Sequence, residues 1–243
     1  MERVQQHEAR SQRLGVWAGL ALLLAASWIG CGSSTETTLV SVSPPDDWVG
    51  SLLADRQMKD SQFREDPQTP LLPADVADFK GLDYWPADEK FYMAGSISYY
   101  DSPEQFTILT TTGEPRPVEK VGHLSFKIGG SIHALQVYRL LDGQSRPGDS
   151  GFFVPFMDLT TGNETYPTGR YVDLVGPIGG PYVLDFNTAY NPSCAYGDPE
   201  RFACPVTPKE NRLELRIEAG ERGYKKGVER SWTPPETEAP TTS

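Results

Sequence analysis

The chain has 243 residues and a formal net charge of −11 at pH 7, and hydrophobic residues make up 38% of it. A protein this acidic is repelled by the phosphate backbone of nucleic acids and by anionic lipid headgroups. We therefore exclude nucleic-acid binding.

The first 30 residues have the pattern of a secretion signal. Arg3, Arg10 and Arg13 precede an uncharged apolar run from Leu14 to Ile29, which is shorter than the roughly 20 residues that a permanent transmembrane helix needs. We expect residues 1–30 to be a signal peptide that is removed. Because this segment carries three arginines and two glutamates, its removal changes the formal charge from −11 to −12.

The stretch SWIGC, Ser27 to Cys31, resembles the lipobox of bacterial lipoproteins. The resemblance implies that Cys31 carries fatty acyl chains such as palmitate, and more than one chain is needed for stable anchoring. We expect an exported protein held on a membrane of the bacterial cell envelope by lipid on Cys31. No aspartate follows Cys31 directly, which favours the outer membrane where two membranes exist. An ordinary secretory signal cut nearby would still export the protein.

The region before the predicted sheet divides into a tether and a helical arm. Residues 31–45 are rich in serine and threonine and end in two prolines, which predicts a flexible tether. Residues 46–80 predict the arm, with an aspartate at 46 or 47 as N-cap of the first helix. Trp48, Leu52, Arg56, Lys59 and Phe63 then follow at helical spacing. A second, short helix is expected within residues 73–79, ending before the glycine at 81.

After residue 84 the apolar period changes from helical to alternating, which is typical of strands. The predicted strands cover residues 91–100, 105–113, 123–128, 131–141, 151–158, 170–175, 181–186 and 211–220. We expect residues 81–220 to form one mainly β domain, a single antiparallel β-sandwich or barrel-like domain with an N-terminal helical arm. Residues 221–243 are rich in proline, threonine and charge and predict a disordered tail.

The two histidines of the predicted sheet do not suggest a metal site. Gly129 and Gly130 fit a two-residue hairpin turn. That turn would pair His123 with Gln136, three residues from His133, so the histidines would point to opposite faces. A three-residue turn would reverse this result. We expect neither a metal nor a cofactor.

Two cysteines remain once Cys31 is lipidated. Cys194 and Cys204 form an even pair in an oxidising compartment, so a disulfide is the default expectation. Closing a loop of this length would stabilise the fold by about 3 kcal/mol. A zinc site is disfavoured because such a site needs four ligands and no histidine or third cysteine lies near the pair.

Polar residues concentrate in two stretches of the predicted sheet. In PFMDLTTGNETYPTGRYVDL, Asp158, Tyr166 and Arg170 could line a pocket in which Arg170 offers a planar fork to a carboxylate or phosphate. Arg170 could instead pair internally with Asp158 or Asp185, because buried charges need partners. The sequence favours the internal pair and leaves the pocket open as an alternative.

The second polar stretch is LDFNTAYNPSCAYGDPERFACP, residues 184–205. Asp185 and Asn187 could hydrogen-bond the main chain of an irregular loop, which would then act as a brace. Alternatively, Asp158, Arg170 and Asp185 converge with Tyr190 in a cleft. Two acids near one arginine could then take different protonation states and act as general acid and base.

The order of these motifs resembles the domain-of-unknown-function 1684 family, uncharacterised bacterial proteins that are often exported as lipoproteins. The resemblance covers about Leu52 to Arg222. It includes the following positions: Asp158, Thr165, Tyr166, Gly169, Arg170, Tyr171, Asp185, Asn187, Tyr190, Asn191, Cys194, Cys204, Pro205, Glu210 and Asn211. It implies the fold boundary and an exported setting, and no reaction.

Besides a purely structural role in envelope assembly, two functions follow as hypotheses. The first is a noncatalytic envelope module that binds a partner protein or a small anionic or sugar-like ligand, with Arg170, Tyr166, Asn187 and Tyr190 as binding residues. The second is a hydrolase that uses Asp158 or Asp185 with Arg170. The hydrolase requires both carboxylates to reach one solvent-filled cleft, and the sequence does not decide whether the protein is an enzyme.

Overall fold

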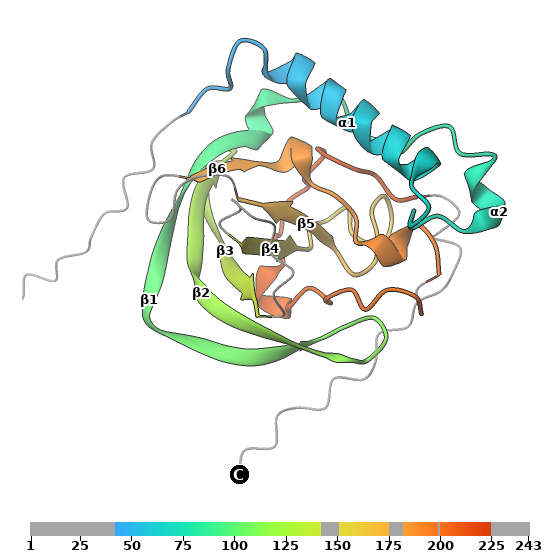
Figure 1. Cartoon of the computed structure of the whole chain (residues 1–243). Helices are drawn as coiled ribbons and strands as arrows, with labels where there is room; N and C mark the ends of the chain where they lie inside the picture. Colours follow the sequence, from blue (N-terminus) through green and yellow to red (C-terminus); the bar gives the residue numbers. More distant parts are fainter. Residues whose placement is uncertain (1–41, 142–150, 175–181, 199, 225–243) are drawn as a thin grey trace, which may run out of the picture. The chain divides into compact units, whose positions relative to one another are not determined.

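Six antiparallel strands form one curled sheet in the order β5-β4-β3-β2-β1-β6. This computed structural model describes residues 42–141, 151–174, 182–198 and 200–224, all within the unit 37–243. The strands are β1 (Tyr92–Leu109), β2 (Pro115–Ile128), β3 (Ser131–Leu140), β4 (Phe152–Phe156), β5 (Arg170–Asp173) and β6 (Tyr182–Asp185). Figure 1 shows β1, β2 and β3 curving around the interior like half of a barrel. The predicted class, mainly β and antiparallel, is confirmed.

The turn between β2 and β3 has the predicted geometry. Gly129 and Gly130 take φ values of 59° and 86°, which only glycine adopts readily at both positions of a two-residue turn. Ile128 consequently pairs with Ser131, and His123 pairs with Gln136. The two histidines therefore lie on opposite faces, as the register predicted.

Two predicted strands, 91–100 and 105–113, are one long strand with an irregularity. The register of β1 against β2 shifts between Tyr99 and Glu104, because the extra residues of a bulge bend the strand without ending it. Gly122 lies opposite this bulge, and a Cβ there would come within 2.3 Å of the carbonyl oxygen of Ser98. The close approach of the two backbones explains why this position is glycine.

The main core fills the inner face of the curl. Phe186 packs edge-on against Phe126 and Phe156, with ring centroids 5.6 and 5.0 Å apart. Leu213 and Ile217, from the C-terminal segment, complete the cluster. Burying each such side chain contributes about 1.5–3 kcal/mol. The short 3-10 helices η1 (Glu89–Phe91), η2 (Phe186–Thr188), η3 (Ser193–Ala195) and η4 (Lys209–Asn211) connect these elements.

The predicted helical arm is present. Helix α1 (Trp48–Glu65) and the single-turn α2 (Pro73–Val76) precede the sheet, and α1 runs across one end of the curl in Figure 1. Asp47 is the N-cap residue, although its side chain makes no capping hydrogen bond. Trp48 anchors the start of α1, because its indole N–H donates to Asp185 at 2.8 Å and its ring meets Tyr92 edge-on.

The prediction of a strand over residues 211–220 is wrong. Leu213 and Ile217 are buried while Arg212 and Glu214 are exposed, so the alternation in the sequence does report burial. However, the pairing of this segment is too short to form a strand: one isolated bridge, Met157 to Arg212, is present among the described residues, and three backbone hydrogen bonds join residues 211–215 to Met157 and Leu159. From Ile217 onward, side chains of Arg170 and Asp158 contact the backbone, as described below.

The folded unit also extends past the expected end at residue 220. Glu221 is 1% exposed, and its amide N–H donates to the carbonyl oxygen of Ala189. Its carboxylate has buried partners, which a compositional argument does not detect. Of the expected tail, residues 225–243 lie outside the described residues, as do the signal peptide, Cys31 and most of the tether.

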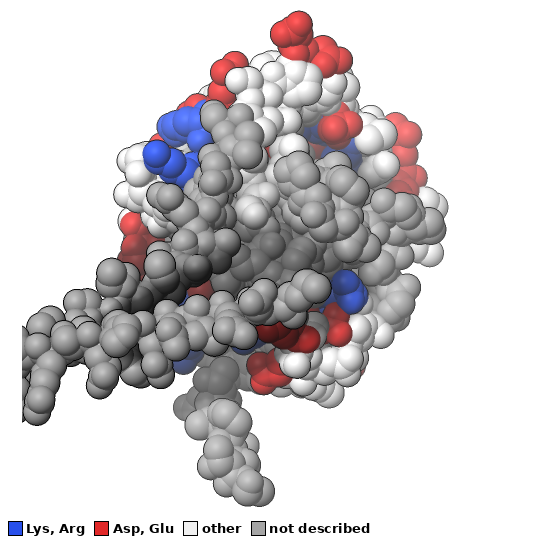
Figure 2. All heavy atoms as spheres, turned by 90° about the vertical axis from the view of Figure 1, so that its left-hand side faces the viewer, with Lys and Arg blue, Asp and Glu red and all other residues white. Residues whose placement is uncertain are grey.

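Among the described residues, no helix is both long enough and apolar enough to cross a membrane. Figure 2 shows the acidic side chains of one face in several separate groups, with basic side chains between them. Among the side chains visible on this face, therefore, the acidic ones do not form a single patch.

Candidate functional site

Arg170, the residue first considered for ligand binding, lies in the interior and is 1% exposed. Its Nη1 donates to the carbonyl oxygens of Ala219 at 2.5 Å and Glu221 at 3.2 Å, and its Nη2 donates to that of Ile217 at 2.8 Å. Burial lowers the pKa of Arg170 to about 10, against the opposing effect of Asp158 and Glu221. The planar fork thus binds this chain's own carbonyl groups.

Asp158 completes the same arrangement from the other side. Its Oδ2 accepts the amide N–H of Ile217 at 2.7 Å, and its Oδ1 accepts the hydroxyl of Thr160 at 2.8 Å. The ion pair between Asp158 and Arg170 is loose, with Oδ1 and Nη2 separated by 3.6 Å. Arg170 and Asp158 together supply donors and acceptors to the backbone of residues 217–221, whereas the backbone of residues 211–215 pairs with that of Met157 and Leu159.

Asp185 and Asn187 form a separate brace. Oδ1 of Asp185 accepts both the amide and the side-chain N–H of Asn187 at 2.8 Å, while Oδ2 accepts the indole N–H of Trp48. Asn187 in turn exchanges two hydrogen bonds with the backbone of Asp88. The contacts match the bracing role that the sequence suggested for these two residues.

The structure does not bring the two candidate catalytic acids to a common site. Asp158 and Asp185 are 1% and 8% exposed, have different partners, and do not line the large cleft described below. The hydrolase hypothesis required a shared, solvent-filled cleft, so the geometry gives it no support.

The two cysteines lie side by side beneath the surface. Both are buried, the amide N–H of Cys194 donates to Sγ of Cys204 at 3.2 Å, and the expected bond between the two sulfurs is not formed in this structure. Tyr166, a predicted binding residue, is 4% exposed and packs in the same cluster. Burial and the neighbouring thiols raise the pKa of Tyr166 above its usual value of 10. Tyr166 is thus part of the packing around the sulfurs.

Of the predicted binding residues, Asn187 and Tyr190 line a cleft; Asn187 is buried, whereas Tyr190 is partly exposed. The backbone of Tyr190 exchanges two hydrogen bonds with that of Tyr171, at 2.9 and 3.0 Å, and the two rings meet at 90° with centroids 5.8 Å apart. Its hydroxyl donates to the exposed carboxylate of Asp173 at 3.1 Å. Backbone and ring contacts therefore hold Tyr190 rigidly while one side stays accessible.

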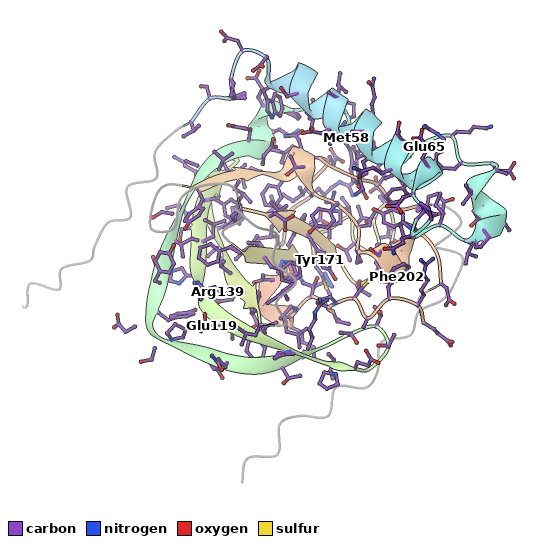
Figure 3. The ribbon with its side chains drawn as sticks, viewed as in Figure 1. Met58, Glu65, Glu119, Arg139, Tyr171 and Phe202 are labelled. Atoms are coloured by element: carbon purple, nitrogen blue, oxygen red, sulfur yellow. The ribbon has the colours of Figure 1, made fainter. Side chains whose placement is uncertain are left out.

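The cleft lies between α1, the hairpin that joins β1 to β2, and the loops after β6, and has a volume of about 1000 Å³. In Figure 3, Met58 lies on α1, Tyr171 near the centre and Phe202 on a C-terminal loop, and all three line the cleft. Among the described residues, eight of those that line the cleft are phenylalanine or tyrosine: Phe63, Tyr84, Phe152, Phe153, Tyr171, Tyr190, Tyr196 and Phe202.

Charges of both signs are balanced among the described residues that line the cleft. The four cations are Arg56, Lys59, Arg116 and Arg201. The four anions are Asp55, Glu114, Asp173 and Glu221. This balance contrasts with the net charge of −11 for the whole chain. The described lining of the cleft is therefore polar and aromatic without an excess of either charge.

One wall of the cleft contains a buried carboxylate. Glu221 forms an ion pair with Lys59 of α1, and it also accepts a hydrogen bond from the hydroxyl group of Tyr196. The amide and side-chain N–H groups of Asn191 donate to its Oε2 at 3.0 and 3.2 Å. Burial, with the charge of Glu221 adding to it, raises the pKa of Tyr196 well above 10. Tyr196 therefore remains a neutral donor to Glu221.

Arg56 joins α1 to the same wall. Its guanidinium donates to the carbonyl oxygens of Trp85 at 3.0 Å and Asn187 at 3.2 Å, and it lies 4.4 Å from the centroid of the Tyr84 ring. Burial lowers the pKa of Arg56. Polar contacts, as well as the apolar stripe, thus hold α1 over the cleft.

In the part of the chain that the structure describes, no three histidine, cysteine or acidic residues are grouped to hold a metal ion.

Comparison with known proteins places this architecture in a family. The family model described as "Protein of unknown function (DUF1684)" matches residues 77–222, which is more than half of the chain. The chain belongs to this family. The match takes in the curled sheet, Arg170, Tyr190 and Glu221, and leaves α1 outside. The order of motifs in the sequence had indicated the same family.

A DUF1684-like fold is also found in a solved structure. The uncharacterized protein from gene locus rrnAC0354 of Haloarcula marismortui, determined by solution NMR, is 36% identical, with a TM-score of 0.55. The similarity covers 72% of this chain and 94% of that one. That protein comes from an archaeon, so this architecture is not confined to bacteria. No curated protein matches the chain.

Within this DUF1684 chain, sequence reasoning identified Tyr190 and missed Glu221 and its link to Lys59. One signal was available. Arg56 and Lys59 continue the helical stripe of Trp48, Leu52 and Phe63, and cations on a core-facing stripe require buried acceptors. The acceptors are the carbonyl oxygens bound by Arg56 and the carboxylate of Glu221.

Proposed function

We propose that this protein is a noncatalytic binding module that holds a small sugar-like ligand in the cleft beneath α1. The observation that carries the proposal is the combination of an aromatic lining with balanced charge in a cleft of about 1000 Å³. Small-ligand sites commonly have volumes of about 300–1,000 Å³ and a few well-placed polar groups among aromatic side chains.

The lining suits the chemistry of a sugar. A sugar ring has apolar C–H faces, which pack on aromatic rings, and a rim of hydroxyl groups that both donate and accept hydrogen bonds. Tyr190 offers a fixed aromatic ring, Asp173 offers acceptor oxygens beside it, and Lys59 offers donor hydrogens. These groups favour a polar, uncharged ligand.

An anionic ligand, the other form first considered, is less well supported. The cations of the cleft already have acceptors within the protein. Lys59 is paired with Glu221, Arg56 donates to two carbonyl oxygens, and Arg201 donates to the carbonyl oxygen of Thr69 at 3.1 Å. An anion would have to displace these partners, whereas a hydroxyl group can bind beside them.

We further propose that the protein works outside the cytoplasm, on a membrane of the cell envelope, with lipid on Cys31 and residues 31–45 as tether. The support is the apolar run followed by the lipobox-like SWIGC motif. Metabolic labelling with a fatty-acid analogue tests this. We expect label on the wild-type chain and none on Cys31→Ala, and equal labelling of both would contradict the assignment.

In that compartment we propose that Cys194 and Cys204 form a disulfide. The support is their burial side by side, with the amide of one residue against the sulfur of the other at 3.2 Å. Intact-mass measurement of the exported protein, with and without a reducing agent, tests the bond. Free thiols in the exported, unreduced protein would contradict it.

A thermal-shift screen tests ligand binding. A ligand that binds only the folded state adds about 2.7 kcal/mol at 100 times its dissociation constant. We expect neutral mono- or oligosaccharides to raise the Tm of the wild type and to have a much weaker effect on Tyr190→Ala.

Tyr100→Ala is the matched control. Tyr100 is partly exposed and hydrogen-bonded through its hydroxyl to Gln136, but it lies outside the cleft. The control should retain the wild-type response. Absence of a response from every sugar, or an equal response in Tyr190→Ala, would contradict the proposal.

A further inference from the structure

We infer that Glu221 makes the cleft selective for uncharged sugars over acidic sugars, because it neutralises the ammonium group that Lys59 presents to the ligand. The inference rests on the proposed function and names its selectivity. It follows from the different solvent exposure of the two side chains that form the ion pair.

The two charges lie at different depths in the wall. The side chain of Glu221 is 2% exposed, whereas that of Lys59 is 28% exposed. The ammonium nitrogen of Lys59 lies 5.2 Å from the ring centroid of Tyr190, one of the aromatic residues that line the cleft. A ligand packed beside Tyr190 would therefore meet Lys59 first, with the carboxylate of Glu221 directly behind it.

The position of Lys59 in front of Glu221 affects which ligand groups can bind beside them. A lysine ammonium has three N–H donors, and an ion pair with one carboxylate leaves donors for a second acceptor. A sugar hydroxyl can accept such a hydrogen bond without change to the net charge. A ligand carboxylate in the same place would gain from Lys59 but would be repelled by Glu221, whose charge a buried setting screens little.

The hydrogen bonds of Glu221 indicate a substitution that removes the charge of its side chain and keeps its size and shape. Its Oε2 accepts from both N–H groups of Asn191 and from Tyr196, while Oε1 faces Lys59. In Glu221→Gln, the amide oxygen can keep the three donors on the Oε2 side. The amide NH₂ group would then face Lys59, donor against donor, and the ammonium would turn toward the cleft with its charge uncompensated.

The test compares binding of two probe sets of equal length, neutral hexose oligosaccharides and uronic-acid oligosaccharides, to the full chain. We expect the wild type to prefer the neutral set, and Glu221→Gln to raise the ratio of acidic to neutral affinity at least tenfold. Glu164→Gln is the control, because Glu164 pairs with Arg216 at the surface and does not line the cleft. Its ratio should equal that of the wild type.

Lys59→Met gives an independent result if Glu221→Gln folds poorly. It leaves the buried carboxylate without its cation, so the ratio of acidic to neutral affinity should fall at least tenfold. Wild-type binding with an unchanged ratio in either folded variant would overturn the inference and leave the proposed function standing. If the wild type binds neither probe set, the proposed function fails and the inference fails with it.

Discussion

Replacement of Arg170 with lysine is expected to destabilise the protein by about 3 kcal/mol, although the positive charge is kept. The guanidinium of Arg170 donates to three carbonyl oxygens, those of Ile217, Ala219 and Glu221, at distances of 2.5 to 3.2 Å. A lysine ammonium is a point charge on a flexible stem and does not reproduce this planar fork. We expect it to keep one of the three contacts.

The magnitude follows from the two contacts that are lost. A hydrogen bond to a charged group contributes about 1.5–3 kcal/mol, and a buried acceptor left without a partner costs a similar amount. The loss of two hydrogen bonds at about 1.5 kcal/mol each gives about 3 kcal/mol. This is a large part of a typical free energy of unfolding of about 5–15 kcal/mol. The ion pair with Asp158 adds little to this difference, because it is loose at 3.6 Å and lysine keeps the charge.

Urea unfolding followed by tryptophan fluorescence measures the effect. Trp85 is a suitable reporter, since its ring lies 5.2 Å from the guanidinium carbon of Arg170. Arg216→Lys is the matched control, because Arg216 contacts Glu164 and Glu218 but lies at the surface. Surface ion pairs contribute little, so this control should unfold like the wild type. If Arg170→Lys also unfolds like the wild type, the carbonyl contacts do not stabilise the segment.

Two further substitutions test contacts that the strands of the sheet make. Gly122→Ala should destabilise the fold by about 1–3 kcal/mol, as overpacking does, because its Cβ would lie 2.3 Å from the carbonyl oxygen of Ser98; a Tm equal to that of the wild type would contradict this. The second substitution is at Glu210. Burial acts to raise the pKa of Glu210, but hydrogen bonds from the backbone of Glu210 and from Lys120 and Tyr138 lower it below 4.5. A carboxyl with a lowered folded-state pKa stabilises above its unfolded-state pKa, and this contribution is lost as the pH falls through the folded-state value. Glu210→Gln should therefore be less stable than the wild type at about pH 6, and the difference should disappear in acid titrations below about pH 4.5; a constant difference would refute the assignment.

The sequence predicted most of the sheet because strand formation here follows local patterns. Alternating burial located the strands, and two adjacent glycines determined the β2–β3 register that separates His123 from His133. The same pattern misled at residues 211–220. Alternation reports that an extended segment has one buried side, and it does not report whether the backbone pairs with a strand or with side chains such as Arg170 and Asp158.

The candidate site was harder to predict because its parts come from distant segments. Arg170 was recognised as a buried-charge candidate, yet its acceptors are carbonyl oxygens, which no residue pattern marks. Glu221 fell in a stretch whose composition indicates disorder, and its ion-pair partner Lys59 lies 162 positions earlier in the chain. The useful local signal was a pair of cations on the core-facing stripe of a helix.

Chemical-shift mapping by NMR tests the central claim, that the cleft beneath α1 is the ligand site, most directly. The labelled full chain is titrated with the neutral oligosaccharides that raise its Tm. We expect saturable shifts at cleft residues such as Tyr190, Asp173 and Lys59, and none at Arg216 and Glu164, which pair with each other and do not line the cleft. Shifts centred on Arg216 and Glu164, or no saturable shifts at all, would contradict this claim.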